Sequence, residues 1–225
     1  ATTAGVVGYT AGTVTIADVN AGTANANTIS TVTLKNAGAA TVDSNALSTL
    51  NLEGTLVTVN TTNSSIATTP AVTTLALNLK GATSTGAVTA DAEVTTLNVK
   101  SSTTDSTLNT LVANGATAIN ISGDAALTVT TLTAGAANKV ITVTNTAGVT
   151  IGNALATDVT FTGGAGADSV ILSASYTKAI NMGAGDDTVV YAAAGAGGSL
   201  NGGAGNDTLV VSAASAIAGL PEVSG

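Results

Sequence analysis

Three glycine-rich stretches in the C-terminal third of the sequence carry the residues best suited to chemistry. They match the pattern G-G-x-G-x-D-x-U-x, in which U is apolar and which binds calcium as a repeat. The glycines permit tight turns whose carbonyl oxygens point at one centre, and the aspartate adds a charged oxygen. Calcium takes about six to eight oxygen ligands, so the pattern predicts calcium as the cofactor. The candidate metal-binding residues are Gly163, Gly164, Ala165, Gly166, Asp168, Met182, Gly183, Ala184, Gly185, Asp187, Gly202, Gly203, Ala204, Gly205 and Asp207.

The spacing of the three aspartates predicts where they meet. Asp168 precedes Asp187 by 19 residues, and Asp187 precedes Asp207 by 20. If each interval is one coil of a stacked fold, neighbouring carboxylates lie ~5 Å apart and repel one another unless a cation sits between them. We therefore expect Asp168 and Asp187 to share one ion and Asp187 and Asp207 to share another. The intervening half-turns lack the motif, which predicts calcium along one edge only.

Each part of this pattern also has a plainer interpretation. A single Gly-Gly-x-Gly run is most simply a flexible turn, but three copies with Asp and an apolar residue at the same offsets argue for a site. The middle copy has Met182 in place of the first glycine, where a positive φ would be strained. Six other acidic residues lie in turn-like contexts that suit solvated or Asx-turn side chains: Asp18, Asp43, Asp91, Glu93, Asp105 and Asp124. Among them, Asp91 and Glu93 are the best candidates for a further calcium ligand.

The elements that must position these loops are short strands of the type apolar-x-apolar. Their last members recur at intervals of 18 to 27 residues, and a second strand of the same kind lies between most of them. The turns are rich in Gly, Asn, Asp and Ser, and no repeat has a helical period. Each repeat therefore holds two strands and two turns. The recurring strands are Val32–Leu34, Leu50–Leu52, Leu77–Leu79, Leu97–Val99, Ile119–Ile121, Ile141–Val143 and Val159–Phe161.

This period predicts an all-β fold, a right-handed parallel β-helix that continues into a calcium-binding β-roll. Strands centred on Leu97, Ile119 and Ile141 should then be adjacent and parallel. An antiparallel sandwich is the alternative, although it does not require one motif to recur in register. We expect parallel β-helix coils over 1–158, calcium β-roll coils over 159–211, and an incomplete coil or the truncated end of a larger protein over 212–225.

Composition restricts the class of function. With 13 acidic residues against 5 lysines, the chain would repel a phosphate backbone, so we expect no nucleic-acid partner. Cysteine is absent, and metal ions are the obvious substitute for disulfides in a secreted protein. No apolar run is long enough to cross a bilayer, so we expect no membrane insertion. The chain begins with Ala rather than Met, and we interpret it as an excised segment.

The glycine-rich third resembles the repeats-in-toxin (RTX) calcium proteins that bacteria export by type I secretion. A wider resemblance, to crystalline surface-layer (S-layer) proteins of the Caulobacter type, is carried by Thr31–Leu34, Ala40–Leu47, Thr117–Asp124 and Phe161–Asp168. It implies an extracellular location on the bacterial cell surface and a calcium-dependent two-dimensional lattice. The partners it implies are copies of the same protein, with cell-surface polysaccharide contacted through regions outside this chain. Anchoring and secretion signals are likewise expected outside it.

Three other functions compete with a structural, non-enzymatic lattice segment. A generic RTX adhesin or another type I-exported protein would carry the same loops. A polysaccharide-active β-helix enzyme is more distant, because the chain has no His, Cys or Arg, which removes His-based triads and an Arg base. A pair of carboxylates could still hydrolyse a glycoside. Ice binding, suggested by the outward threonines, would need a regularity that coils of 18 to 27 residues disturb.

Overall fold

The computed structural model describes residues 2–9, 12–64, 71–135, 139–173, 176–191, 198–211 and 222–224, and within them the chain is all β. No described segment is a helix long and apolar enough to span a membrane. The strands are β1 (Thr2–Val7), β2 (Thr13–Ala17), β3 (Ile29–Ala37), β4 (Ala39–Asp43), β5 (Thr49–Leu56), β6 (Val59–Thr62), β7 (Thr74–Thr89), β8 (Thr96–Ser101), β9 (Ser106–Val112), β10 (Ala118–Gly123), β11 (Leu127–Thr133), β12 (Val140–Val143), β13 (Val149–Leu155), β14 (Thr160–Thr162), β15 (Ser169–Leu172), β16 (Ile180–Asn181), β17 (Thr188–Tyr191), β18 (Ser199–Asn201), β19 (Thr208–Val211) and β20 (Glu222–Ser224).

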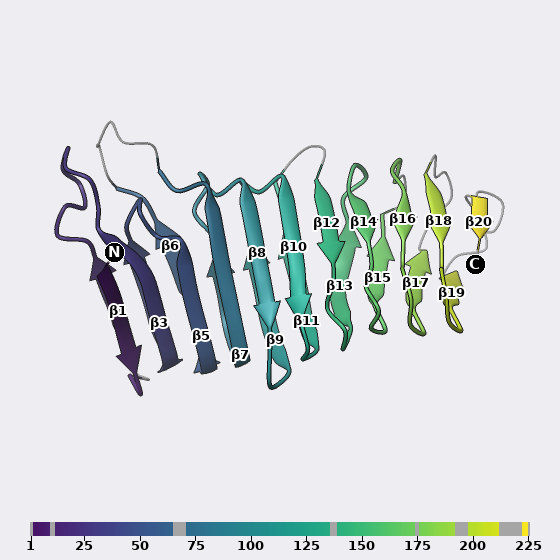
Figure 1. The fold of residues 1–225 in the computed structure, drawn as a ribbon, viewed down its shortest axis with the longest axis horizontal. Coiled ribbons are helices and arrows are strands. Elements are labelled where there is room, and N and C mark those ends of the chain that lie inside the picture. Colours follow the sequence, from purple (N-terminus) through teal and green to yellow (C-terminus); the bar gives the residue numbers. More distant parts are fainter. Residues whose placement is uncertain are drawn as a thin grey trace.

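Every strand pairing among the described residues is parallel, and the pairings form two ladders. The first ladder stacks β1, β3, β5, β7, β8, β10, β12, β14, β16, β18 and β20, and the second stacks β2, β4, β6, β7, β9, β11, β13, β15, β17 and β19. The long strand β7 belongs to both. Figure 1 shows the chain advancing along a rod from β1 at one end to β20 at the other. The molecule is a parallel β-solenoid, as expected for a right-handed parallel β-helix, and the sandwich alternative is wrong.

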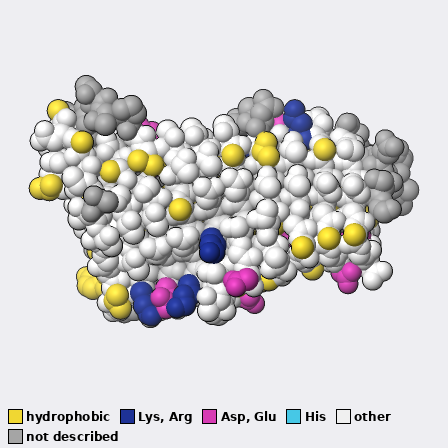
Figure 2. Space-filling view, in the orientation of Figure 1, with side chains coloured by type: hydrophobic (Ala, Val, Ile, Leu, Met, Phe, Trp, Pro, Cys, Tyr) yellow, Lys and Arg dark blue, Asp and Glu magenta, His cyan; other side chains and the backbone are white. Residues whose placement is uncertain are grey.

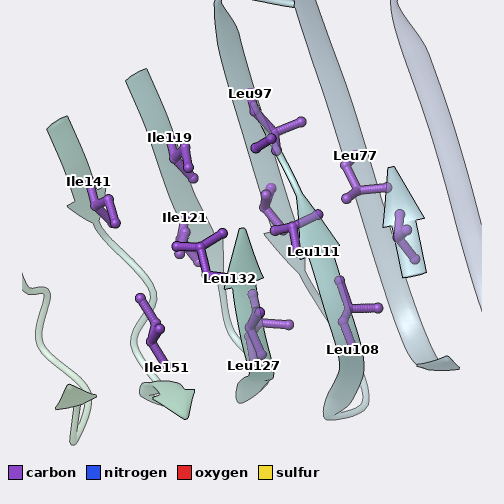
Figure 3. Close-up of a cluster of buried hydrophobic side chains, with 14 of the residues drawn as sticks. Leu77, Leu97, Leu108, Leu111, Ile119, Ile121, Leu127, Leu132, Ile141 and Ile151 are labelled. Atoms are coloured by element: carbon purple, nitrogen blue, oxygen red, sulfur yellow. The ribbon is translucent and has the colours of Figure 1, made fainter. Parts of the chain in front are cut away.

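Stacked aliphatic side chains fill the space between the ladders. In the first ladder, one inward column runs through Leu97, Ile119, Ile141, Phe161 and Ile180, which pair in register and are at most 2 % exposed. Figure 3 shows side chains of the same kind reaching into this space from both ladders. Burying each such side chain stabilises the fold by about 1.5–3 kcal/mol. The prediction that the strands centred on Leu97, Ile119 and Ile141 are adjacent and parallel is confirmed.

Register survives large differences in coil length because the extra residues lie outside the paired strands. Leu50 and Leu77 are 27 residues apart and still pair directly. A one-residue slip would turn every inward leucine toward solvent, so the apolar pattern fixes the pairing. Outside the core, Asn78 Nδ2 donates to Asn51 Oδ1 at 2.8 Å, which ties the same coils from the surface.

The ladders continue without a break from the coils predicted as β-helix into those predicted as β-roll. Strand β12 pairs with β14, and β13 pairs with β15, across residue 158. Of the segment predicted as an incomplete coil, residues 212–221 and 225 lie outside the described part, and β20 pairs in parallel with β18.

We name the two rims of the rod by the direction of the chain. At the loop edge, the chain passes from a first-ladder strand to a second-ladder strand. At the return edge, it passes from a second-ladder strand to the next first-ladder strand.

A buried lysine at the return edge was not predicted. Lys139 is 2 % exposed, and its Nζ donates to the carbonyl oxygens of Ala113, at 3.3 Å, and of Ala116. Burial lowers the pKa of its ammonium group, and the nearby Asp158 carboxylate partly offsets that shift. The cation therefore joins its own coil to the carbonyls of the preceding turn.

Candidate metal centre

The three glycine-rich loops are stacked at the loop edge. They connect β14 to β15, β16 to β17, and β18 to β19. The residues that follow the aspartates, Ser169, Thr188 and Thr208, pair with one another in successive strands. The three aspartates therefore form one column, in the order predicted from their spacing.

The second and third loops share a backbone conformation that only glycine adopts readily. Gly183 and Gly203 both have φ of 97°, while Gly185 and Gly205 have φ of 126° and 137°. The loops also approach closely: a Cβ on Gly203 would lie 1.9 Å from the carbonyl oxygen of Gly183. The Gly183 carbonyl accepts from the N–H of Ala204 at 2.9 Å, and Ala184 bridges Ala204 in parallel, so successive loops are joined through their main chains.

Met182 causes no strain at the position where the pattern has its first glycine. Its φ lies outside the left-handed region, and its side chain is fully buried in the core. The concern about a positive φ there is therefore wrong. Because the second and fourth residues of this loop carry the left-handed turns, the first position accepts an L-amino acid whose side chain points inward.

Replacing Gly203 with alanine should cost more stability than the φ angle alone explains. The left-handed φ contributes about 1–2 kcal/mol, and the contact with the Gly183 carbonyl adds to it, for a total of about 3 kcal/mol or more. Gly22→Ala is the matched control, because Gly22 has φ of 70° but open space around it, with nothing within 4 Å of where a Cβ would stand. Urea unfolding of both variants measures the difference. Equal costs would mean that the loops do not approach as closely as the structure shows.

The carboxylates of the column bind backbone N–H groups of neighbouring coils. Asp187 Oδ1 accepts from the N–H of Asp168 at 2.6 Å, and Asp207 Oδ1 accepts from the N–H of Asp187 at 3.1 Å. Asp168 Oδ1 accepts from the N–H of Val149 at 2.8 Å, and its Oδ2 accepts from the N–H of Gly164 at 3.0 Å. Each aspartate therefore caps the strand start of the preceding coil. The spacing of the aspartates in the sequence does not indicate this capping role.

Asp187 is the member of the column whose charge is least compensated. Only 1 % of the residue is accessible, and its Oδ2 is buried with no hydrogen-bond partner. Burial, followed by repulsion from Asp168, Asp207 and Asp186, raises the pKa of its carboxyl to about 6, against a lowering by the Asp168 N–H. Burial also raises the pKa of Asp168. The ionised form of Asp187 is thus disfavoured unless a cation neutralises it.

These residues fit a calcium ion better than a metal held by side chains alone. Among the described residues, no group of three or more acidic, His or Cys side chains could hold an ion by itself. An ion here would need main-chain oxygens together with the Asp187 carboxylate, which is the mixed oxygen set that calcium accepts. The buried, unpartnered Oδ2 is one such oxygen, and the carbonyl oxygens of Gly164 and Gly183 lie close to the glycines of the following loops.

Asp186, next to Asp187, lies on the outside. Its Oδ1 accepts from the N–H of Asn206 in the following coil at 2.9 Å, in an exposed hydrogen bond. Asp105 acts in the same way three coils before the first loop, accepting from the N–H of Ala126 at 2.9 Å. Asp186 and Asp105 therefore cap the next coil, whereas the aspartates of the inward column cap the preceding one.

The remaining acidic candidates serve turns. Asp91 Oδ1 accepts from the N–H of Glu93 at 2.9 Å, an Asx turn, and Glu93 Oε2 accepts from Asn63 Nδ2 at 2.6 Å. Asp124 accepts from the N–H of Thr103. Asp43 accepts from the N–H and hydroxyl of Ser64, and these contacts agree with the plainer interpretation of the sequence.

Asp18 makes an Asx-turn contact with the N–H of Asn20, as that interpretation allows, but it is buried rather than solvated. Its carboxylate accepts from the N–H groups of Asn20 at 2.9 Å and of Thr28 and Ile29 at 2.6 Å each. Burial raises its pKa, but these hydrogen bonds together hold the pKa well below its usual value. The carboxylate fastens the long turn between β2 and β3.

Asp18→Ala should therefore destabilise the N-terminal coils by about 2–3 kcal/mol at neutral pH, because buried N–H donors lose their acceptor. Since the folded-state pKa is depressed, the contribution is complete above the unfolded pKa of about 4 and is lost as pH falls through the folded value. Hydrogen exchange of the Thr28 and Ile29 amides from pH 7 to pH 3 checks this. Asp124→Ala, which removes an exposed acceptor, is the control, and a pH-independent difference would contradict the assignment.

A functional residue that sequence reasoning missed is Asn145, in the turn one coil before the first loop. It is fully buried; its Oδ1 accepts from the N–H groups of Ala147 and Gly148, and its Nδ2 donates to the Ala125 carbonyl at 2.8 Å. Its signal in the sequence is only an Asn three residues before a Gly in a turn. The side-chain amide organises this turn from within.

No protein-family model and no curated protein matches the sequence. The strand pairings by themselves show a parallel β-solenoid that carries three stacked glycine-rich loops.

Proposed function

We propose that the chain is a structural segment of a secreted bacterial cell-surface protein, of the RTX type found in S-layers, in which calcium joins adjacent coils. The observation that carries the proposal is the Asp187 carboxylate, buried between two other carboxylates with one oxygen unpartnered. Such a group costs free energy in the metal-free fold. A cation that binds only the folded coils recovers that cost and adds stability.

Calcium would act as a switch for folding and assembly. Extracellular calcium sites work in the millimolar to sub-millimolar range, whereas free calcium in cytoplasm is far lower, so a chain of this kind can be exported unfolded and fold outside the cell. The coils from about Phe161 onward depend on the ion. The coils before them are stabilised by aliphatic columns without such loops.

The proposal assigns the chain no catalytic role. The paired-carboxylate chemistry that remains without His or Arg requires carboxyl groups that a sugar can reach. Asp168 and Asp187 are each 1 % exposed and bound to backbone N–H groups, which favours a structural use. The more exposed carboxylates of Asp91, Glu93 and Asp124 accept hydrogen bonds from nearby turn residues.

The surface suits packing against copies of the same chain at the cell exterior. On the face in Figure 2, charged side chains are few; most lie along the lower rim and others lie mid-face and at the upper rim, while uncharged polar side chains and backbone cover most of the rod. An RTX adhesin or another exported protein would share the loops and this surface. Lattice formation distinguishes an S-layer segment from an adhesin segment. Negative-stain microscopy with calcium, on the purified chain and on the full-length protein, should show ordered arrays of the full-length protein. Chelation of calcium should dissolve these arrays. Calcium binding without any array would favour the adhesin.

Calcium binding should depend more strongly on Asp187 than on its neighbour. Asp187→Ala should weaken affinity by about tenfold or more, because it removes the buried charged oxygen, while Asp186→Ala should have a much smaller effect. Isothermal titration calorimetry with calcium, and with magnesium as the competing ion, measures both. Equal losses in the two variants would show that the wrong member of the pair has been assigned.

A further inference from the structure

The three loops have the same motif but different structures. The second and third loops match in their left-handed glycines, at Gly183 with Gly203 and at Gly185 with Gly205. In the first loop none of Gly163, Gly164 and Gly166 has a left-handed φ. The main chain of the first loop therefore differs from that of the other two. Since loops that hold an ion in the same way need the same backbone, the first loop is not equivalent to the second and third as a calcium site.

The carboxylate of the first loop is already satisfied by the protein. Asp168 Oδ1 binds the N–H of Val149 in the preceding coil, and Oδ2 binds the N–H of Gly164 in its own loop. In the preceding coil, the amide of Asn145 binds its turn from inside. The two N–H donors leave neither carboxylate oxygen of Asp168 without a partner.

The carboxylate of the second loop is not satisfied. Asp187 Oδ1 has one N–H donor, from Asp168, and Oδ2 has none although the residue is 1 % exposed. No N–H of its own loop reaches Oδ2 in the way that Gly164 reaches Asp168. A negative oxygen buried without a donor is a position for a cation.

We propose that Asp168 is not a calcium ligand but a hydrogen-bonding cap that closes the column, and that calcium binding centres on Asp187. The inference rests on the proposed function, namely that these loops bind calcium. It replaces the two equivalent shared ions expected from the sequence by calcium at Asp187, with the column closed at Asp168 by hydrogen bonds from the N–H groups of Val149 and Gly164.

The two aspartates should respond in opposite ways to the same substitution. In Asp168→Asn, the new NH₂ faces a backbone N–H, so the metal-free protein should unfold at lower urea concentration while calcium affinity stays within about threefold of wild type. In Asp187→Asn, a neutral NH₂ replaces the unpartnered charged oxygen, so the metal-free protein should be at least as stable as wild type. Its calcium affinity should fall by about tenfold or more. Asp186→Asn should change neither quantity appreciably.

Urea unfolding in a chelator and calcium calorimetry on the four proteins test this. Equal loss of affinity in Asp168→Asn and Asp187→Asn would overturn the inference, whereas failure of the wild-type protein to bind calcium would overturn the proposed function instead. If Asp168→Asn does not fold, the carboxylate ¹³C resonances of wild type decide: calcium should shift that of Asp187 and leave that of Asp168 nearly unchanged. A larger shift at Asp168 contradicts the assignment.

Discussion

Replacing Phe161 with alanine should lower the free energy of unfolding by about 3–5 kcal/mol, because the largest side chain of its column leaves a cavity that the stacked coils cannot close. Phe161 is fully buried between Ile141 and Ile180, its direct neighbours in the first ladder. It also lies in the strand that leads into the first glycine-rich loop. Urea unfolding monitored by circular dichroism measures the loss.

Val140→Ala is the matched control for this substitution. Val140 lies in the adjacent strand β12 but points outward and is 44 % exposed, so its truncation should cost less than about 0.5 kcal/mol. In a stacked fold each coil contacts only its neighbours, so the Phe161 defect should appear first in the adjacent coils. A loss below about 1 kcal/mol for Phe161→Ala would mean that the column is not packed as described.

Removing calcium should also have a large effect, confined to the C-terminal coils. An ion present at about 100 times its dissociation constant stabilises the folded state by about 2.7 kcal/mol. A chelator withdraws that stabilisation and leaves the repulsion between Asp168, Asp187 and Asp207 uncompensated. Thermal unfolding with calcium, with magnesium and with chelator should give a higher midpoint only with calcium. The same midpoint in all three would mean that the carboxylates do not need the ion.

The fold was predictable because its signal is repeated. One apolar column recurs in nearly every coil, and its register follows from the sequence even where the coil from Leu50 to Leu77 is 27 residues long. That pairing also shows that unequal coil lengths do not disturb alignment, so coil length gives no ground for rejecting a regular outer face. The stacking of Asp168, Asp187 and Asp207 was predictable for the same reason.

The roles of single polar residues were not predictable, because they depend on the coil above or below. Lysine is rarely buried, and the sequence around Lys139 does not indicate that its Nζ donates to the carbonyl oxygens of Ala113 and Ala116. The difference between Asp168, with both oxygens bound, and Asp187, with one free, arises from donors that the motif does not encode. The motif determines which carboxylate oxygens are present, and the N–H donors of neighbouring coils determine which of these oxygens have a hydrogen-bond partner.

Amide hydrogen exchange with and without a chelator tests the calcium switch most directly. Chelation should remove protection from β17 and β19, the strands that follow the Asp187 and Asp207 loops, while β8 and β10, in coils held by aliphatic columns, should keep theirs. Arrays of the full-length protein should dissolve under the same treatment. If protection from Asp168 to Val210 and the order of the arrays both survive calcium removal, the ions are incidental and the switch is wrong.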